Sequence, residues 1–98
     1  LILTAQAYAK NPGNQYTGIE TRLVRGATQL GLISQNAGYV NTSSYNVLNI
    51  SYNYLDSPAT TSSTTYKVQF RNTQNAASVE VSANATETAS MILMEIGA

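Results

Sequence analysis

The carboxylates are the side chains through which this sequence could catalyse hydrolysis. They number five: Glu20, Asp56, Glu80, Glu87 and Glu95. A carboxylate pair cleaves a glycosidic bond only when the two groups flank it, whereas these five lie one per predicted element, at spacings that force no two together. The chain also has no His and no Cys, so it lacks the commonest general base, the thiol nucleophile and the usual transition-metal ligands. The sequence therefore predicts a protein that is not an enzyme and holds no metal and no cofactor.

Tyrosine is the residue type with the clearest binding potential. The chain has 7 Tyr against 1 Phe and no Trp, and a tyrosine offers a flat apolar ring together with a hydroxyl group. Tyr16, Tyr39 and Tyr45 lie at or beside predicted turns, where they could contact a carbohydrate or a receptor, although packing of these rings within the protein fits the sequence equally well. The binding residues that we predict are Tyr39, Asn41 and Tyr45, and we place receptor contact on the polar loops at 35–44, 56–64 and 72–77.

The charged residues are few and balanced. Five basic and five acidic residues give a net charge of zero, and only 10% of residues are charged, against about 25% in ordinary domains. The basic residues form no stripe that could follow a phosphate backbone, so we expect no nucleic-acid partner. No segment approaches the roughly 18 apolar residues of a membrane span, so we expect no membrane insertion. Neutral polar groups dominate instead, since Ser, Thr and Asn make up 32 of the 98 residues.

The length of 98 residues allows one domain, which we assign to residues 1–98. A chain of this size buries only about 60 to 65% of its unfolded surface, and this one has no disulfide or metal site to stabilise it. Association with other copies is then the expected source of stability. Because the sequence begins at Leu1, inside an apolar run, we expect it to be the C-terminal part of a longer chain.

Apolar residues recur with a period of two along most of the chain, which is the pattern of half-buried strands. The predicted strands are residues 1–9, 17–25, 29–33, 45–54, 65–71, 79–81 and 89–96, and residues 34–44 are predicted to form a loop. In the strand at 65–71, for example, Tyr66, Val68 and Phe70 are expected to point inward. Seven strands separated by turns in fewer than 100 residues predict an all-β fold, an antiparallel β-sandwich.

The last predicted strand is apolar on both faces. Met91 and Leu93 lie on one side, and Ile92, Met94 and Ile96 on the other. Such a strand is expected to be central in its sheet or to lie against another subunit. The residues that we predict at a subunit interface are Val79, Val81, Met91 and Leu93.

Three segments resemble structural proteins of bacteriophages, particularly marine and cyanobacterial ones. Residues 54–69 read Tyr-Leu-Asp-Ser-Pro-Ala-Thr-Thr-Ser-Ser-Thr-Thr-Tyr-Lys-Val-Gln, and residues 90–96 read Ser-Met-Ile-Leu-Met-Glu-Ile, similar to the closing strand of those proteins. Residues 23–31, Leu-Val-Arg-Gly-Ala-Thr-Gln-Leu-Gly, resemble their middle hairpin. The sequence departs from the resemblance at 76–81, where those proteins frequently have a Tyr-Ile-Asn strand.

The resemblance implies a jelly-roll-like head of the tumour-necrosis-factor and complement type, with its first strands upstream of Leu1. It also implies a homotrimer on a fibre or spike, placed on the outer surface of the virion and in contact with other virion proteins. The expected function is non-enzymatic attachment to a host surface glycan or receptor. The alternatives are a capsid decoration protein, a soluble lectin-like carbohydrate-binding domain, and, third, an enzyme that depolymerises the host capsule.

Overall fold

The described part of the chain is built from antiparallel β-strands. The structure is a computed structural model, and it describes residues 1–10, 17–39, 45–73, 78–82, 84 and 86–97. Its strands are β1 (Ile2–Lys10), β2 (Ile19–Arg25), β3 (Thr28–Ala37), β4 (Asn46–Tyr54), β5 (Tyr66–Asn72), β6 (Val79–Val81) and β7 (Ser90–Leu93). These described ranges contain no helix, so the all-β prediction is confirmed.

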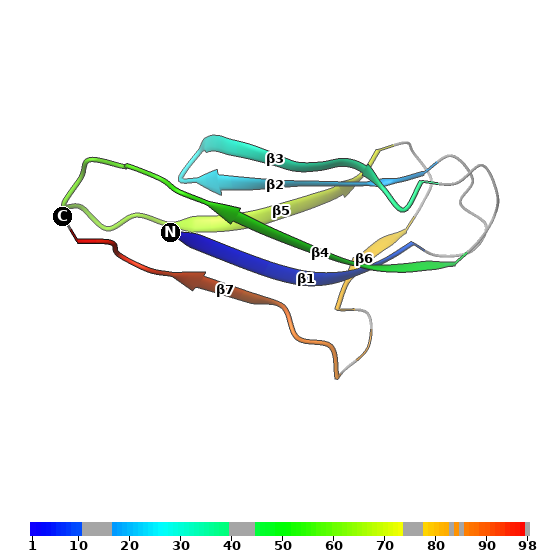
Figure 1. Ribbon diagram of the computed structural model, residues 1–98. Coiled ribbons are helices and arrows are strands. Elements are labelled where there is room, and N and C mark those ends of the chain that lie inside the picture. The colour runs from blue at the N-terminus through cyan, green and yellow to red at the C-terminus, as the bar shows by residue number, and fades with distance from the viewer. Residues whose placement is uncertain (11–16, 40–44, 74–77, 83, 85, 98) are drawn as a thin grey trace.

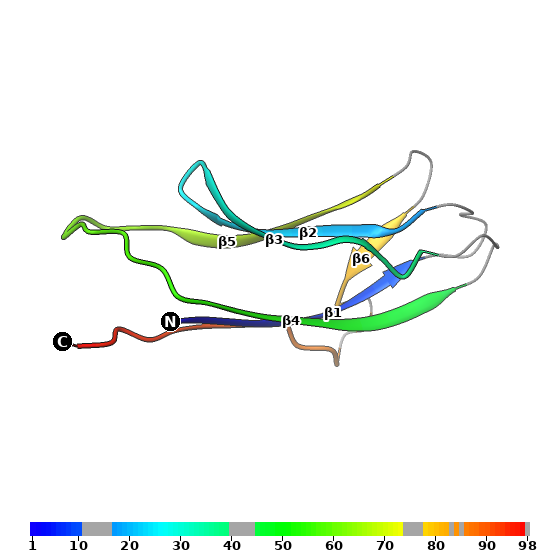
Figure 2. The same cartoon turned by 45° about the horizontal axis from the view of Figure 1, so that its top comes forward.

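The strands form two antiparallel sheets that face each other (Figures 1 and 2). In the four-stranded sheet, β1 pairs with β4 along one edge. The other edge of β1 is shared, because β7 pairs with its residues 2–5 and β6 with its residues 8–10. The three-stranded sheet has the order β3-β2-β5. Two facing antiparallel sheets agree with the predicted sandwich.

The core lies between β1 and β2, the central strands of the two sheets. Even-numbered residues of β1 point inward, and Ile2 and Tyr8 are buried there. From β2, Ile19, Thr21 and Leu23 point inward and are at most 1% exposed, as their alternation with polar residues predicts. The rings of Tyr8 and of Phe70 on β5 form a T-shaped contact, with ring centroids 5.7 Å apart, so an aromatic contact joins the sheets.

One side of the sandwich is closed by β3 and β4. Gly31 on β3 lies so close to Tyr52 on β4 that a Cβ atom there would stand 2.6 Å from the tyrosine hydroxyl. The Asn46 side-chain amide donates a hydrogen bond of 2.9 Å to the carbonyl of Gly38, which follows β3. The missing side chain of Gly31 therefore allows the edges of the two sheets to approach.

Strand β3 is longer than predicted, because it continues to Ala37 where the sequence suggested a loop from residue 34. The pairing of β3 with β2 shifts register near Thr21, and Ser34 compensates for this irregularity. Its hydroxyl donates to the carbonyl of Ile19 at 3.1 Å and lies 2.8 Å from the Thr21 hydroxyl. A residue type typical of turns thus satisfies backbone and side-chain groups inside a bulged strand.

The prediction that the last strand is central within its sheet is wrong for the described chain. Strand β7 pairs with β1 alone and covers only residues 90–93. Met91 is half-buried, and two apolar side chains of the strand are exposed, Ile92 at 52% and Leu93 at 53%. The alternative, that this strand lies against another subunit, stays a prediction.

Leu23 provides a test of the core. Replacing it with Ala should lower the free energy of unfolding by about 2 to 5 kcal/mol, because a fully buried leucine loses its contacts and leaves a cavity. Leu32, the same residue type on the adjacent strand, is 44% exposed, so Leu32→Ala should cost no more than about 0.5 kcal/mol. Urea unfolding followed by circular dichroism gives both values, and equal losses would contradict the assignment of the core.

Gly31 provides a test of the closed side. Gly31→Ala should lower the free energy of unfolding by about 1 to 3 kcal/mol, the usual cost of overpacking, because the new methyl group meets the Tyr52 hydroxyl. Tyr52→Phe removes that hydroxyl, so the same Ala substitution should cost less in the Phe background. A double-mutant cycle measures the difference, and independent, additive effects would show that the two residues do not meet.

Candidate functional site

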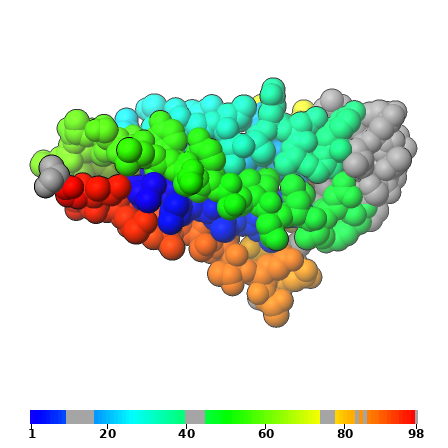
Figure 3. All heavy atoms as spheres, viewed as in Figure 1, coloured from blue at the N-terminus to red at the C-terminus, as the bar shows by residue number. Residues whose placement is uncertain are grey.

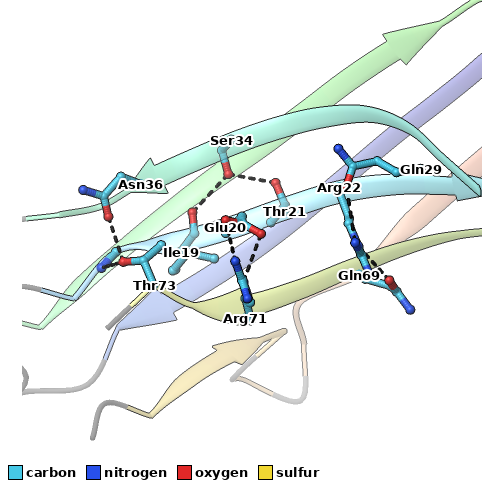
Figure 4. Close-up of polar contacts among 11 residues, drawn as sticks. Ile19, Glu20, Thr21, Arg22, Gln29, Ser34, Asn36, Gln69, Arg71 and Thr73 are labelled. Atoms are coloured by element: carbon cyan, nitrogen blue, oxygen red, sulfur yellow. Dashed lines mark hydrogen bonds and ion pairs between the residues drawn. The ribbon is translucent and has the colours of Figure 1, made fainter. Parts of the chain in front are cut away.

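The outer face of the three-stranded sheet gathers long polar side chains. Each comes from a position that alternates with an inward-facing one, and the set is Glu20 and Arg22 on β2, Gln29 on β3, and Gln69 and Arg71 on β5. Together with Val68 and Phe70 they border a hollow of about 610 Å³. We call these five residues the polar face (Figure 4).

Arg22 is the centre of the polar face. Its Nε atom donates to the side-chain carbonyl of Gln69 at 2.9 Å, and its Nη1 atom donates to that of Gln29 at 3.3 Å. One guanidinium group thereby joins side chains from all three strands of the sheet. These contacts hold the amides of both glutamines on the solvent side of the sheet, where they can meet a ligand.

Arg71 and Glu20 form the second contact of this face. The Nε and Nη2 atoms of Arg71 lie 3.0 and 3.1 Å from the two carboxylate oxygens of Glu20. The Arg71 side chain is 70% exposed, and exposed pairs of this kind contribute only about 0 to 1 kcal/mol to stability. The pair orients two charged groups at the rim of the hollow more than it stabilises the fold.

The polar face has the chemistry of a hydrogen-bonding surface. Amides, a guanidinium group and a carboxylate lie side by side and offer donors and acceptors to a polar ligand such as a carbohydrate. The face has a single carboxylate, Glu20, whereas glycoside hydrolysis uses two. Within the ranges that the structure describes, no three Asp or Glu side chains gather as a metal site would require.

A second cluster joins the two sheets at the end of the sandwich where β2 meets β3. The Nη1 atom of Arg25 lies 2.7 and 2.8 Å from the carboxylate oxygens of Asp56, two residues after β4. The Tyr66 hydroxyl donates to the same carboxylate at 2.7 Å. The Asp56 side chain is only 10% exposed. Sequence analysis missed this cluster because its members are 31 and 10 residues apart and no local pattern links them.

The ionisation of Asp56 follows from these contacts. Burial acts to raise its pKa, but hydrogen bonds from Tyr66 and Arg25 and the charge of Arg25 outweigh burial and hold the pKa below its ordinary value. The hydrogen bond to Asp56 in turn raises the pKa of the Tyr66 hydroxyl. The cluster is therefore a charged, structural connection between the sheets at neutral pH.

The predicted binding residues lie elsewhere. Tyr39 and Tyr45 follow β3 and precede β4, and they are 40% and 47% exposed. Neither borders the hollow of the polar face. Asn41 and Tyr16 lie outside the described residues. Both loop tyrosines are exposed, and their role in binding stays a prediction.

The predicted interface residues share one face of the four-stranded sheet. Each pairs with an even-numbered position of β1, and the pairs are Val79 with Lys10, Val81 with Tyr8, Met91 with Thr4, and Leu93 with Ile2. All four are therefore on the inward face, along the edge formed by β6 and β7. In the structure the four residues lie in one row, an arrangement that their spacing in the sequence did not establish.

Comparisons with known proteins leave the family open. No family model matches this chain, and no match was found among curated proteins or among solved structures. Among the described residues, no helix is long and apolar enough to cross a membrane.

Acid should weaken the protein through Asp56. Because its folded-state pKa is below the ordinary value of about 3.9, the stabilisation is complete above that value and is lost as pH falls through the folded pKa. Urea unfolding between about pH 7 and pH 2 should show this loss in the native protein. Asp56→Asn should be less stable at neutral pH and should lose less further stability in acid, and Tyr66→Phe should fall between. If the free energies of unfolding of Asp56→Asn and of the native protein fell by equal amounts as the pH was lowered, the assignment of the acid effect to Asp56 would be contradicted.

Proposed function

We propose that this chain is a non-enzymatic head domain of a fibre or spike on the outer surface of a bacteriophage particle, where it attaches to the host. We also propose that the strands have a jelly-roll-like connectivity, that the chain assembles as a homotrimer, and that this homotrimer contacts other virion proteins. Resemblance of three segments to bacteriophage structural proteins is its basis. The two-sheet, all-β fold is compatible with it.

The arrangement of those three segments is the observation that carries the proposal. Residues 23–31 run from the end of β2 through the turn into β3, and residues 54–69 run from the end of β4 into β5. Arg25 of the first segment binds Asp56 and the backbone nitrogen of Gly26 donates to the Thr65 carbonyl at 2.8 Å. Residues 93–96 of the third segment border a hollow of about 560 Å³ beside Asp56 and Tyr66. Three segments selected by resemblance alone meet at one end of the molecule.

The polar face is the surface that suits attachment to a glycan. Its five residues carry a net charge of +1, because Glu20 offsets only one of its two arginines, and this agrees with a neutral or weakly acidic sugar. A shallow face of this kind binds weakly, so several copies on one particle would give useful avidity. The loop residues Tyr39, Asn41 and Tyr45 are the other candidate surface.

A soluble lectin-like domain is the second candidate, because the hollow on the polar face would serve a free sugar-binding protein equally well. A capsid decoration protein needs no such face. A capsule depolymerase needs paired carboxylates, and the described Glu20 and Asp56 are each bound by an arginine. The location of the protein separates the first two candidates.

Purified particles test the location. Mass spectrometry should find this chain in amounts stoichiometric with other virion proteins. Its absence from particles, together with sugar binding by the free protein, would replace the virion proposal with the lectin-like one.

Adsorption tests the polar face. Arg22→Ala removes a charged donor whose hydrogen bonds are worth about 1.5 to 3 kcal/mol, so adsorption of particles that carry it should fall about tenfold or more while assembly is unchanged. Asn53→Ala, an exposed polar residue on the other sheet, is the matched control. Normal adsorption with Arg22→Ala and a loss with Tyr39→Ala would move the binding site to the loops.

A further inference from the structure

One side of the sandwich is open in the described chain. On that side β5 ends the three-stranded sheet, and β6 and β7 end the other. Between these edges is a hollow of about 290 Å³, lined mainly by inward-facing apolar residues that include Tyr8, Val68, Phe70, Val81 and Met91. Phe70 is 39% exposed although it points inward. The core thus reaches the surface between β5 and β7, and we call this region the open side.

A buried polar group at the open side lacks a partner. Gln6 borders the hollow and is 8% exposed. Its Nε2 atom donates to the Ser90 carbonyl at 3.2 Å, whereas its Oε1 atom is buried and has no hydrogen bond among the described residues. An unpaired buried acceptor costs about 1 to 3 kcal/mol. This edge of the core is therefore less stable than a fully hydrogen-bonded one.

The accessible surface and the radius of gyration of the chain exceed those of a compact monomer of this size. The accessible surface is 6087 Å², which is about 650 Å² more than the roughly 5,400 Å² expected for a folded monomer of this mass. The radius of gyration is 15.1 Å, against about 12.6 Å for a compact domain of this length. The excess area approaches the roughly 800 Å² that each partner buries in an ordinary protein interface.

The two edges of the open side carry opposite charges. Strand β5 contains Lys67 and Arg71, of which Arg71 is paired with Glu20, and no acidic residue, whereas β6 contains Glu80 and no basic residue and β7 is uncharged. The hollow between the edges is lined by uncharged residues. The edge of one copy is therefore complementary to the other edge of a second copy, and the zero net charge of the chain opposes no self-association.

We propose that a second copy of this chain covers the open side, with β5 of one copy beside β6 and β7 of the next. This inference deepens the homo-oligomeric part of the proposed function and rests on it. Because unlike edges meet, the contact is head-to-tail, and it forms a closed ring when the rotation between copies allows. The added strand supplies backbone N–H donors to an edge that has unpaired groups. It places the row of Val79, Val81, Met91 and Leu93, together with Val68 and Phe70, inside the assembly.

Light scattering after size-exclusion chromatography tests the interface. The native protein should be an oligomer, and Met91→Asp and Phe70→Asp should reduce it to the mass of one chain. Leu32→Asp is the matched control, because it places the same charge on an exposed apolar residue of β3, and it should remain oligomeric. Circular dichroism checks that each variant is folded. Oligomers that persist in both open-side variants would overturn the proposed interface and leave the oligomeric part of the proposed function intact.

Cross-linking identifies the occupant without depending on those variants. The chain has no Cys, so Lys67→Cys on β5 and Ser90→Cys on β7 introduce unique thiols. A mixture of the two single variants should give a covalent dimer with a short bis-maleimide. Mixtures in which Val47→Cys, on the closed side, takes the place of either variant should give no such dimer. Efficient cross-linking through Val47→Cys alone would overturn the proposal. A native protein that stays monomeric at micromolar concentration would overturn it together with the homotrimer, and would leave the open side to a different polypeptide segment.

Discussion

The packing of β1 against β2 is the interaction on which the rest of the structure depends. Tyr8 from β1 and Ile19 and Leu23 from β2 are among the largest fully buried side chains. Every other described strand pairs with one of these two: β4, β6 and β7 with β1, and β3 and β5 with β2. A loss of contact between the two central strands would therefore separate the two sheets and break the cluster around Asp56 that joins them.

The core is covered more completely on one side of the sandwich than on the other. At the side of β3 and β4, the missing side chain of Gly31 lets the sheets approach, and Tyr52 fills the space between them. At the side of β5, the neighbouring sheet offers only the short strands β6 and β7, which share one edge of β1. Side chains that face inward there remain partly exposed, as Phe70 shows. The same scaffold that presents polar groups on its outer face thus has an apolar opening at one edge.

Local alternation predicted the strands well, because a period of two depends only on neighbouring residues. The strand predicted at 45–54 is β4, and its exposure alternates from residue to residue as predicted. Features set by pairing were harder to predict. The sequence alone did not show that β7 has one neighbour, that Ser34 satisfies a bulged strand, or that Arg25 and Asp56 meet. The polar face was missed for a related reason, since its five residues come from three strands whose order is not written in the sequence.

Amide hydrogen exchange measured at increasing protein concentration directly tests whether another copy of the chain covers the open side. Backbone N–H groups on the free edges of β5 and β7 have no strand partner in the described chain, and such groups exchange readily unless another strand pairs with them. If a second copy covers the open side, protection at residues 66–72 and 90–93 rises with concentration, while exchange at the free edges of β3 and β4 stays unchanged. Rapid exchange of the β5 and β7 edges at every concentration, or new protection at β3 and β4 instead, would contradict it.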